Sequence, residues 1–107
     1  MTKPYAVVFS PRAESHLEYL YAYIADNSAE ERAERFVGRI IETCLNLSTF
    51  PKRGTNRDDI RPNLRTTYHA GRVTIAYSVD DENATVAILG VYYGGQDFER
   101  LISETDE

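Results

Sequence analysis

Ala84-Thr-Val-Ala-Ile-Leu-Gly-Val-Tyr-Tyr93 is the one stretch of this 107-residue chain that stays apolar without alternation. A run of this kind predicts a central β-strand that is covered on both faces of its sheet. Strict alternation divides its side chains between the two faces, with Val86, Ile88 and Tyr92 on one and Ala87, Leu89, Val91 and Tyr93 on the other. The chain must therefore supply two covering layers or borrow one from a partner.

Two amphipathic helices precede this strand and predict the first of those layers. Ser10-Pro11 is typical of a helix start, and apolar side chains at helical spacing continue to about Asn27. Ser28-Ala-Glu-Glu31 is a capping-box pattern that predicts a second helix, which runs to about Ser48 before Pro51. Because almost no linker separates the two helices, we expect them to form an antiparallel hairpin.

Shorter β patterns lie on either side of the hairpin. Strands are predicted at residues 5–9, 64–69, 72–79 and 84–93, with a loop at 52–63. The order β-α-α-β-β-β predicts one α+β domain over residues 1–107, in which a helical hairpin covers one face of an antiparallel sheet of three to four strands. Residues 5–9 are expected at one edge of that sheet. The second face of the 84–93 strand is covered either by Phe98, Leu101 and Ile102 or by a partner.

The net charge of −5 is distributed unevenly along the chain. Between Lys52 and Arg72, six basic residues stand against two acidic ones, so the remainder is more acidic than the net charge suggests. Overall acidity argues against sequence-independent binding to duplex DNA, which needs a broad basic face. The local basic segment is either a solvated loop or a binding surface. With no apolar run of membrane-spanning length and a single cysteine, the composition predicts a cytoplasmic protein with no membrane association.

Few residues in the sequence suggest a catalytic, metal or cofactor site. No metal site or cofactor is expected, because the two histidines are far apart and Cys44 lies on an apolar helix stripe. Arg61, Arg65, His69 and Arg72 could together form a metal-independent ribonuclease site, in which arginines stabilise phosphorane charge and the histidine moves protons. Such a site needs a further cation near the end of the 84–93 strand, where this chain has Tyr93-Gly-Gly-Gln96. The favoured interpretation is therefore a binding surface.

Several segments, taken in their order and spacing, resemble the ParE branch of the RelE/ParE superfamily of bacterial toxins. They are Val8-Phe-Ser-Pro-Arg-Ala-Glu14, Phe50-Pro51 with Gly54, Asp59-Ile-Arg-Pro-Asn-Leu-Arg65, Ile75-Ala-Tyr77 and Ile88-Leu-Gly-Val-Tyr-Tyr-Gly-Gly-Gln-Asp97. The resemblance implies the toxin of a type II toxin–antitoxin pair, a helical hairpin packed on a sheet, and inhibition of DNA gyrase without catalysis. It also implies a ParD-type antitoxin that wraps the toxin, with two toxins per antitoxin dimer or a multiple of this, and contact with operator DNA only through the antitoxin.

The resemblance leaves two alternatives open: a RelE-like endoribonuclease that cuts messenger RNA on the ribosome, and a non-toxic co-repressor partner of the antitoxin. We expect the antitoxin to contact an apolar and tyrosine-rich surface, because tyrosine combines contact area with a polar tip. The candidates for antitoxin binding are His16, Tyr19, Tyr23, Arg61, Arg65, Leu89, Val91 and Tyr93. The candidates for target binding are Arg57, Arg65, His69, Arg72 and Gln96.

Overall fold

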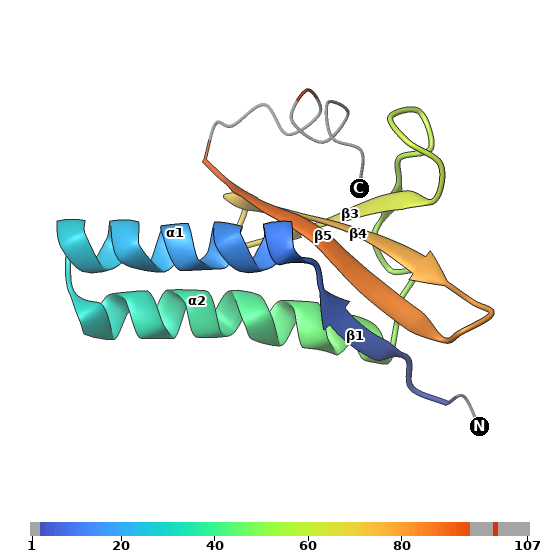
Figure 1. The fold of residues 1–107 in the computed structure, drawn as a ribbon, viewed down its shortest axis with the longest axis horizontal. Helices are drawn as coiled ribbons and strands as arrows, with labels where there is room; N and C mark the ends of the chain where they lie inside the picture. The colour runs from blue at the N-terminus through green and yellow to red at the C-terminus, as the bar shows by residue number, and fades with distance from the viewer. Residues whose placement is uncertain (1–2, 95–99, 101–107) are drawn as a thin grey trace.

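Strand β5, the apolar stretch, lies inside a five-stranded sheet with the order β1-β5-β4-β3-β2. The computed structural model describes residues 3–94 and residue 100. In chain order the elements are β1 (Ala6–Phe9), α1 (Pro11–Asn27), α2 (Glu30–Leu45), the 3₁₀ turn η1 (Asn46–Ser48), β2 (Thr55–Asn56), β3 (Leu64–His69), β4 (Val73–Asp80) and β5 (Thr85–Tyr93). The two helices lie side by side as an antiparallel hairpin against one face of the sheet (Figure 1). The predicted α+β class and helical hairpin are thus confirmed.

The sheet itself differs from the prediction in two respects. It is mixed and has five strands, because β1 runs parallel to β5 while the other neighbouring strands are antiparallel. The extra strand, β2, lies in the segment predicted as a loop and pairs with β3 through Thr55 and Asn56. Gly54 permits this approach, since a Cβ atom there would lie 2.4 Å from the carbonyl oxygen of Thr66.

The helix ends test two capping predictions. Ser10 is the N-cap of α1, and its hydroxyl accepts a hydrogen bond from the Ala13 N–H at 3.1 Å, as predicted. The prediction of a capping box at Ser28 was wrong. The Ser28 N–H donates to the carbonyl of Ile24 and closes α1, while Ala29 is the N-cap of α2 without a side-chain hydrogen bond. With so short a connection, Ser28 serves the end of the first helix.

Strict alternation along β5 was also wrong, because the strand contains a β-bulge. Tyr77 pairs with Ile88 and Ala76 pairs with Gly90, so Leu89 is an extra residue with no partner on β4. The side-chain alternation is reset at this point. Val86 and Ile88 before the bulge, and Val91 and Tyr93 after it, all pack into the cluster beneath the helices, whereas Leu89 and Tyr92 belong to a cluster on the opposite face.

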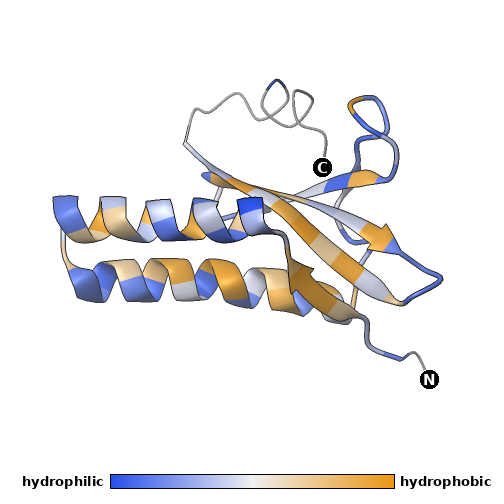
Figure 2. Ribbon diagram, in the orientation of Figure 1, coloured by the Kyte–Doolittle hydropathy of each residue, from blue (hydrophilic) through white to orange (hydrophobic). Residues whose placement is uncertain are grey.

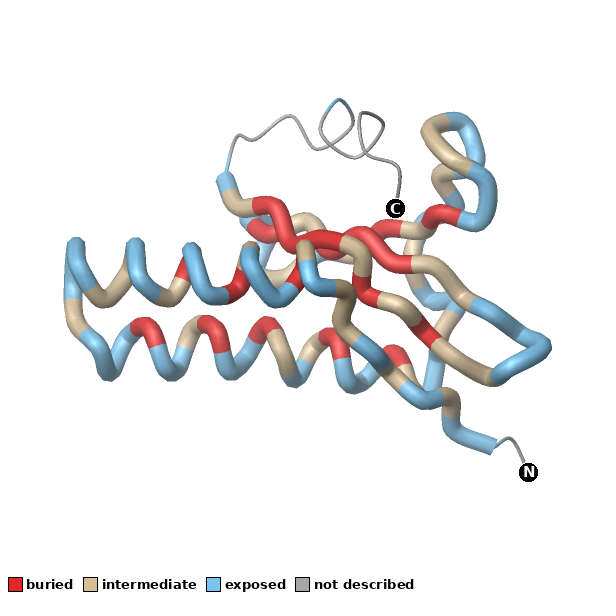
Figure 3. The backbone as a smooth tube through the Cα atoms, viewed as in Figure 1, coloured by how far each residue is buried: buried red, intermediate tan, exposed pale blue. Residues whose placement is uncertain are grey.

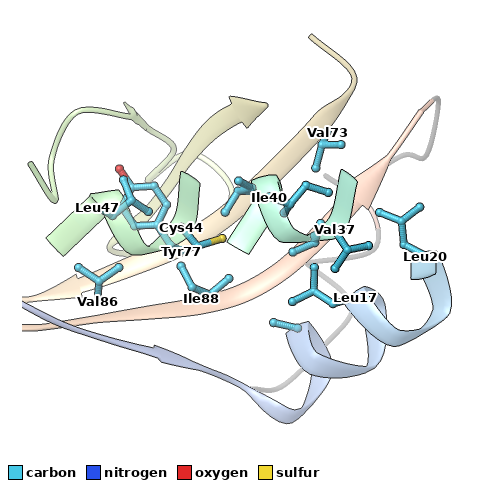
Figure 4. Close-up of a cluster of buried hydrophobic side chains, with 13 residues drawn as sticks. Leu17, Leu20, Val37, Ile40, Cys44, Leu47, Val73, Tyr77, Val86 and Ile88 are labelled. Carbon is cyan, nitrogen blue, oxygen red and sulfur yellow. The ribbon is translucent and has the colours of Figure 1, made fainter. Parts of the chain in front are cut away.

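The main core lies between the hairpin and the sheet. Apolar side chains of both helices meet those of β4 and β5 there, with Ile40, Tyr77 and Ile88 fully buried (Figure 4). Figure 2 shows the apolar stripe along α2, and Figure 3 shows the regular spacing of its buried residues. Cys44 belongs to this core, as predicted, and its burial raises the pKa of the thiol to about 12. It is therefore a packing residue without thiolate reactivity at neutral pH.

The face opposite the helices carries a smaller cluster. Leu64, Ala76 and Tyr92 are buried in it, and Ile60 and Leu89 are packed against it while partly exposed. Phe98, Leu101 and Ile102, which were one of the two alternative covers for this face, lie outside the described residues. None of the described helices is both long and apolar enough to cross a membrane.

Candidate functional site

His16 joins helix α1 to the part of β5 that β1 does not reach. β1 pairs with β5 only at residues 85–88, and beyond that point the Val91 N–H donates to His16 Nδ1 at 3.0 Å. The His16 ring also packs edge-to-face on Tyr92, with 5.0 Å between centroids. Burial, assisted by the charge of Arg12, lowers the pKa of His16. His16 is thus a neutral acceptor that holds α1 against β5, and its place in an antitoxin interface stays a prediction.

The remaining antitoxin candidates do not form one surface. Tyr19 and Tyr23 lie on α1, and 73% and 50% of their respective surfaces are exposed. Val91, in contrast, is buried beneath the helices, and Leu89 lies on the other face of the sheet. The β-bulge is the physical reason, since it turns the side chains of β5 after Leu89.

Arg65 is bonded to the loop that precedes β2. Its Nη2 donates to the carbonyl oxygens of Lys52 and Gly54 at 2.8 and 2.9 Å. The Gly54 N–H in turn donates to the Tyr77 hydroxyl at 3.0 Å. The Arg65 guanidinium, which the sequence placed at a binding surface, therefore fastens this loop to the sheet.

Two other candidates for target binding also bond within the chain. His69 Nδ1 lies 3.0 Å from Thr43 Oγ1, and its ring packs edge-to-face on Phe36, so it contacts helix α2. Arg57 holds the Asp59 carboxylate through two hydrogen bonds of 3.0 Å each. The Arg57 hydrogen bonds are the main reason that the pKa of Asp59 is lowered. Gln96 lies outside the described residues.

Arg61 lies on the other side of the sheet, near Tyr92. Burial raises the pKa of the Tyr92 phenol, while the charges of Arg12 and Arg61 act in the opposite direction. Because Arg65 pairs with Tyr77 and His69 pairs with Val73, both lie on the helix side of the sheet, and the structure does not bring Arg61 together with them. The four residues predicted as a possible ribonuclease site are therefore not assembled as one.

Three arginines that sequence reasoning missed, together with Arg72, a candidate for target binding, line a concavity of about 310 Å³ beside the hairpin. Arg32, Arg35 and Arg39 come from α2, and the fourth arginine, Arg72, comes from the turn before β4. We call this concavity the arginine pocket. Its apolar floor contains Ile24, Phe36 and Tyr93, and Arg72 Nη1 lies 3.5 Å from the Tyr93 hydroxyl. The three α2 arginines are spaced so that they share one side of the helix, and this spacing was the available signal.

A larger concavity, of about 640 Å³, lies around Phe50 and Lys3. Its charged groups are partly paired, since Lys52 Nζ lies 2.7 Å from Asp81 and the Tyr5 hydroxyl also donates to that carboxylate. Among the described residues, no group of three or more histidine, cysteine or acidic side chains could hold a metal ion. The described part of the chain thus has surfaces suited to binding, of which the arginine pocket is the most strongly charged.

Comparison with known proteins gives one consistent relationship. A family model for the ParE toxin of the parDE type II toxin–antitoxin system matches residues 7–98. Toxin ParE1 of Mycobacterium tuberculosis is 28% identical over 93 residues, which cover 87% of this chain and 93% of that toxin.

Solved structures show a similar fold. The chromosomal ParDE system from P. aeruginosa matches with a TM-score of 0.72 and 19% identity, covering 87% of this chain and 99% of that one. The RelBE2 toxin–antitoxin complex from Mycobacterium tuberculosis matches with a TM-score of 0.66 and 25% identity, covering 90% and 98%. A mutant of the E. coli toxin RelE in the free state has a TM-score of 0.63 and 14% identity, with 92% of each chain covered.

Proposed function

The chain belongs to the ParE family of type II toxin–antitoxin toxins, and from this we propose that it inhibits DNA gyrase by binding and is neutralised by a ParD-type antitoxin. We propose that it acts in the cytoplasm as a single toxin domain. In this proposal the protein is not an enzyme, and operator DNA is reached only through the antitoxin.

One observation carries the non-catalytic part of the proposal. Arg65 and His69, the residues best suited to a ribonuclease site, are engaged within the fold: the former holds the carbonyls of Lys52 and Gly54, and the latter packs on Phe36 and Thr43. A catalytic arginine must direct its donors at the charge that develops on the substrate. The Nη2 of Arg65 is directed at two backbone carbonyls instead, which supports a toxin that binds its target.

The antitoxin part of the proposal is supported by exposed apolar surface. Tyr19 and Tyr23 lie one turn apart on α1 and are at least half exposed. Tyrosines of this kind are frequent anchors in protein interfaces because they bury a large area at low entropic cost. We propose that an antitoxin segment, in a complex of two toxins per antitoxin dimer or a multiple of this, covers these residues.

Purified DNA gyrase provides the direct test. We expect this protein to inhibit supercoiling of relaxed plasmid, and we expect its cognate antitoxin to restore supercoiling when added in equal amount. A heat-unfolded sample of the same protein is the control for non-specific inhibition. Unchanged supercoiling over an excess of folded protein would contradict the gyrase proposal.

A RelE-like ribonuclease is the second candidate, because the RelBE2 toxin–antitoxin complex shares this fold at 25% identity. Expression in cells separates the candidates. Gyrase inhibition predicts filamentation and DNA-damage signalling, whereas a ribonuclease predicts rapid arrest of translation with cut messages. Normal growth would favour a non-toxic co-repressor partner of the antitoxin.

A further inference from the structure

The arginine pocket concentrates positive charge on a chain that is acidic overall. Its four arginines surround one concavity of about 310 Å³, although the chain as a whole carries a net charge of −5. No acidic side chain contributes to the described lining. A concavity of this size accommodates one or two side chains of a partner. The pocket is therefore suited to negatively charged groups of a partner.

Two acidic residues near the start of α2, Glu30 and Glu34, are directed away from the pocket. Burial raises the pKa of Tyr21 on α1, and the charges of Glu34 and Glu30 add to this effect, so both carboxylates lie near Tyr21. At 100° per residue, Arg32 and Arg39 lie on the opposite side of α2 from these two glutamates. Glu31 and Glu42 lie on the Arg35 side of α2, but neither of them lines the pocket.

The α2 arginines have no partner of their own within the described part of the chain. Arg57 and Arg65 hold a carboxylate and backbone carbonyls, whereas no hydrogen bond or ion pair joins the guanidinium of Arg32, Arg35 or Arg39 to another described residue. All three are exposed. Guanidinium groups present a planar fork of donors that matches a carboxylate in two-bond geometry. Their donors are consequently available to an incoming anion.

The floor of the pocket is apolar and held in place. Phe36 packs edge-to-face on Tyr93, with centroids 5.9 Å apart, and also on His69. Ile24 completes this floor. A small anion alone would leave the apolar floor exposed to water. A chain segment with an apolar side chain beside its carboxylates would cover the floor and also pair with the arginines.

We propose that the arginine pocket binds an extended acidic segment of a partner protein, whose carboxylates pair with Arg32, Arg35, Arg39 and Arg72 while an adjacent apolar side chain packs on Phe36 and Tyr93. This inference rests on the proposed function, because the partner proposed there is a protein. A long nucleic acid is less suited to the site, since its phosphates beyond the pocket would be repelled by a chain whose net charge is −5.

A peptide titration tests this assignment. The probe is a fluorescein-labelled dodecapeptide of alternating Glu and Leu, measured by anisotropy at low salt. The matched Gln–Leu peptide removes only the charge, and an oligothymidylate of equal charge represents nucleic acid. The proteins are the wild type, the double variant Arg35→Gln/Arg39→Gln, and the control Lys3→Gln/Arg53→Gln, which removes two charges at the larger concavity.

We expect the Glu–Leu peptide to bind the wild type, and the pocket double variant to weaken binding by about tenfold or more, as for loss of one or two charged hydrogen bonds. The control variant is expected to change it by less than about twofold. Equal losses in both variants, absence of peptide binding to the wild type, or pocket-dependent binding of oligothymidylate in place of the peptide would each overturn the assignment.

Side-chain NMR of the wild type provides a measurement that does not depend on variants. We expect the Nε–Hε signals of the pocket arginines to shift on peptide addition while that of Arg53 stays in place. If the pocket signals do not move, the assignment is wrong. A protein that binds the peptide yet leaves gyrase active would remove the gyrase proposal alone, so the two failures are distinguishable.

Discussion

The arginines around β2 and those on α2 show two different uses of the same side chain. Arg65 donates from its Nη2 to the carbonyls of Lys52 and Gly54, and Arg57 pairs with Asp59. Arg35 and Arg39 extend into an exposed concavity instead. The difference teaches that a basic run in the sequence does not by itself mark an interface. An arginine is available to a partner only if the fold does not already supply acceptors for its guanidinium donors.

Substitution of Gly54, whose carbonyl accepts from Arg65, is expected to have the largest effect on stability. A Cβ atom on Gly54 would lie 2.4 Å from Thr66 O and 2.6 Å from the Tyr77 hydroxyl. We expect Gly54→Ala to lower the free energy of unfolding by about 3 kcal/mol, from steric overlap and a lost hydrogen bond. Urea unfolding measures this. Gly38→Ala is the matched control, since nothing lies within 4 Å of a Cβ there, and it is expected to stabilise α2 by up to about 1 kcal/mol. Equal urea midpoints for the two variants would contradict the structural role assigned to Gly54.

We expect substitution of Arg65 to destabilise the protein less than substitution of Gly54. Arg65→Gln removes donors to two backbone carbonyls, and we expect a loss of about 2 kcal/mol in the free energy of unfolding. Amide hydrogen exchange in residues 52–56 should accelerate with it, because the loop loses its attachment. If the variant is as stable as the wild type, Arg65 is not a structural residue and its candidate role in binding returns.

The histidine at the α1–β5 contact predicts a pH dependence of stability. The native pKa of His16 is lowered, chiefly by burial, so the unfolded chain takes up this proton first as pH falls. Stability is then fully present above about pH 6.5 and declines as the pH falls from there toward the native pKa. His16→Gln should flatten this part of the profile and cost about 1 kcal/mol at pH 8. Denaturant titrations between pH 5 and pH 8 measure the slope, and an unchanged slope in the variant would assign it to another group.

The pocket arginines give the smallest expected effect on stability. Arg35→Gln/Arg39→Gln should change the free energy of unfolding by less than about 0.5 kcal/mol, since neither side chain has a described partner. The same urea experiment that destabilises Arg65→Gln should leave this variant near the wild-type midpoint. A loss as large as that of Arg65→Gln would mean that both groups are structural.

Local patterns in the sequence identified most of the fold. The identification of residues 84–93 as a strand inside the sheet, the cap at Ser10 and the helical stripe that contains Cys44 were correct, because each depends on neighbouring residues. The resemblance to the ParE branch was confirmed by a match over residues 7–98. The finer assignments, gyrase and ParD, remain proposals.

The features that the sequence did not reveal depend on contacts between distant segments. The bulge at Leu89 is defined by pairing with β4, and it moved Val91 and Tyr93 to the helix side. The role of Arg65 became visible only with the carbonyls of residues 52 and 54 beside it. The arginine pocket joins α2 to a turn more than thirty residues later. Side-chain periodicity reports on one element at a time and does not contain this information.

Cleavage of messenger RNA on the ribosome tests most directly whether this toxin acts by binding. Programmed ribosomes are incubated with folded protein, and the message is examined by primer extension. With Arg65 and His69 engaged inside the fold, we predict a full-length message at every protein concentration that inhibits gyrase. Defined cuts in the message, present with the wild type and lost in a folded Arg65→Lys variant, would contradict that account.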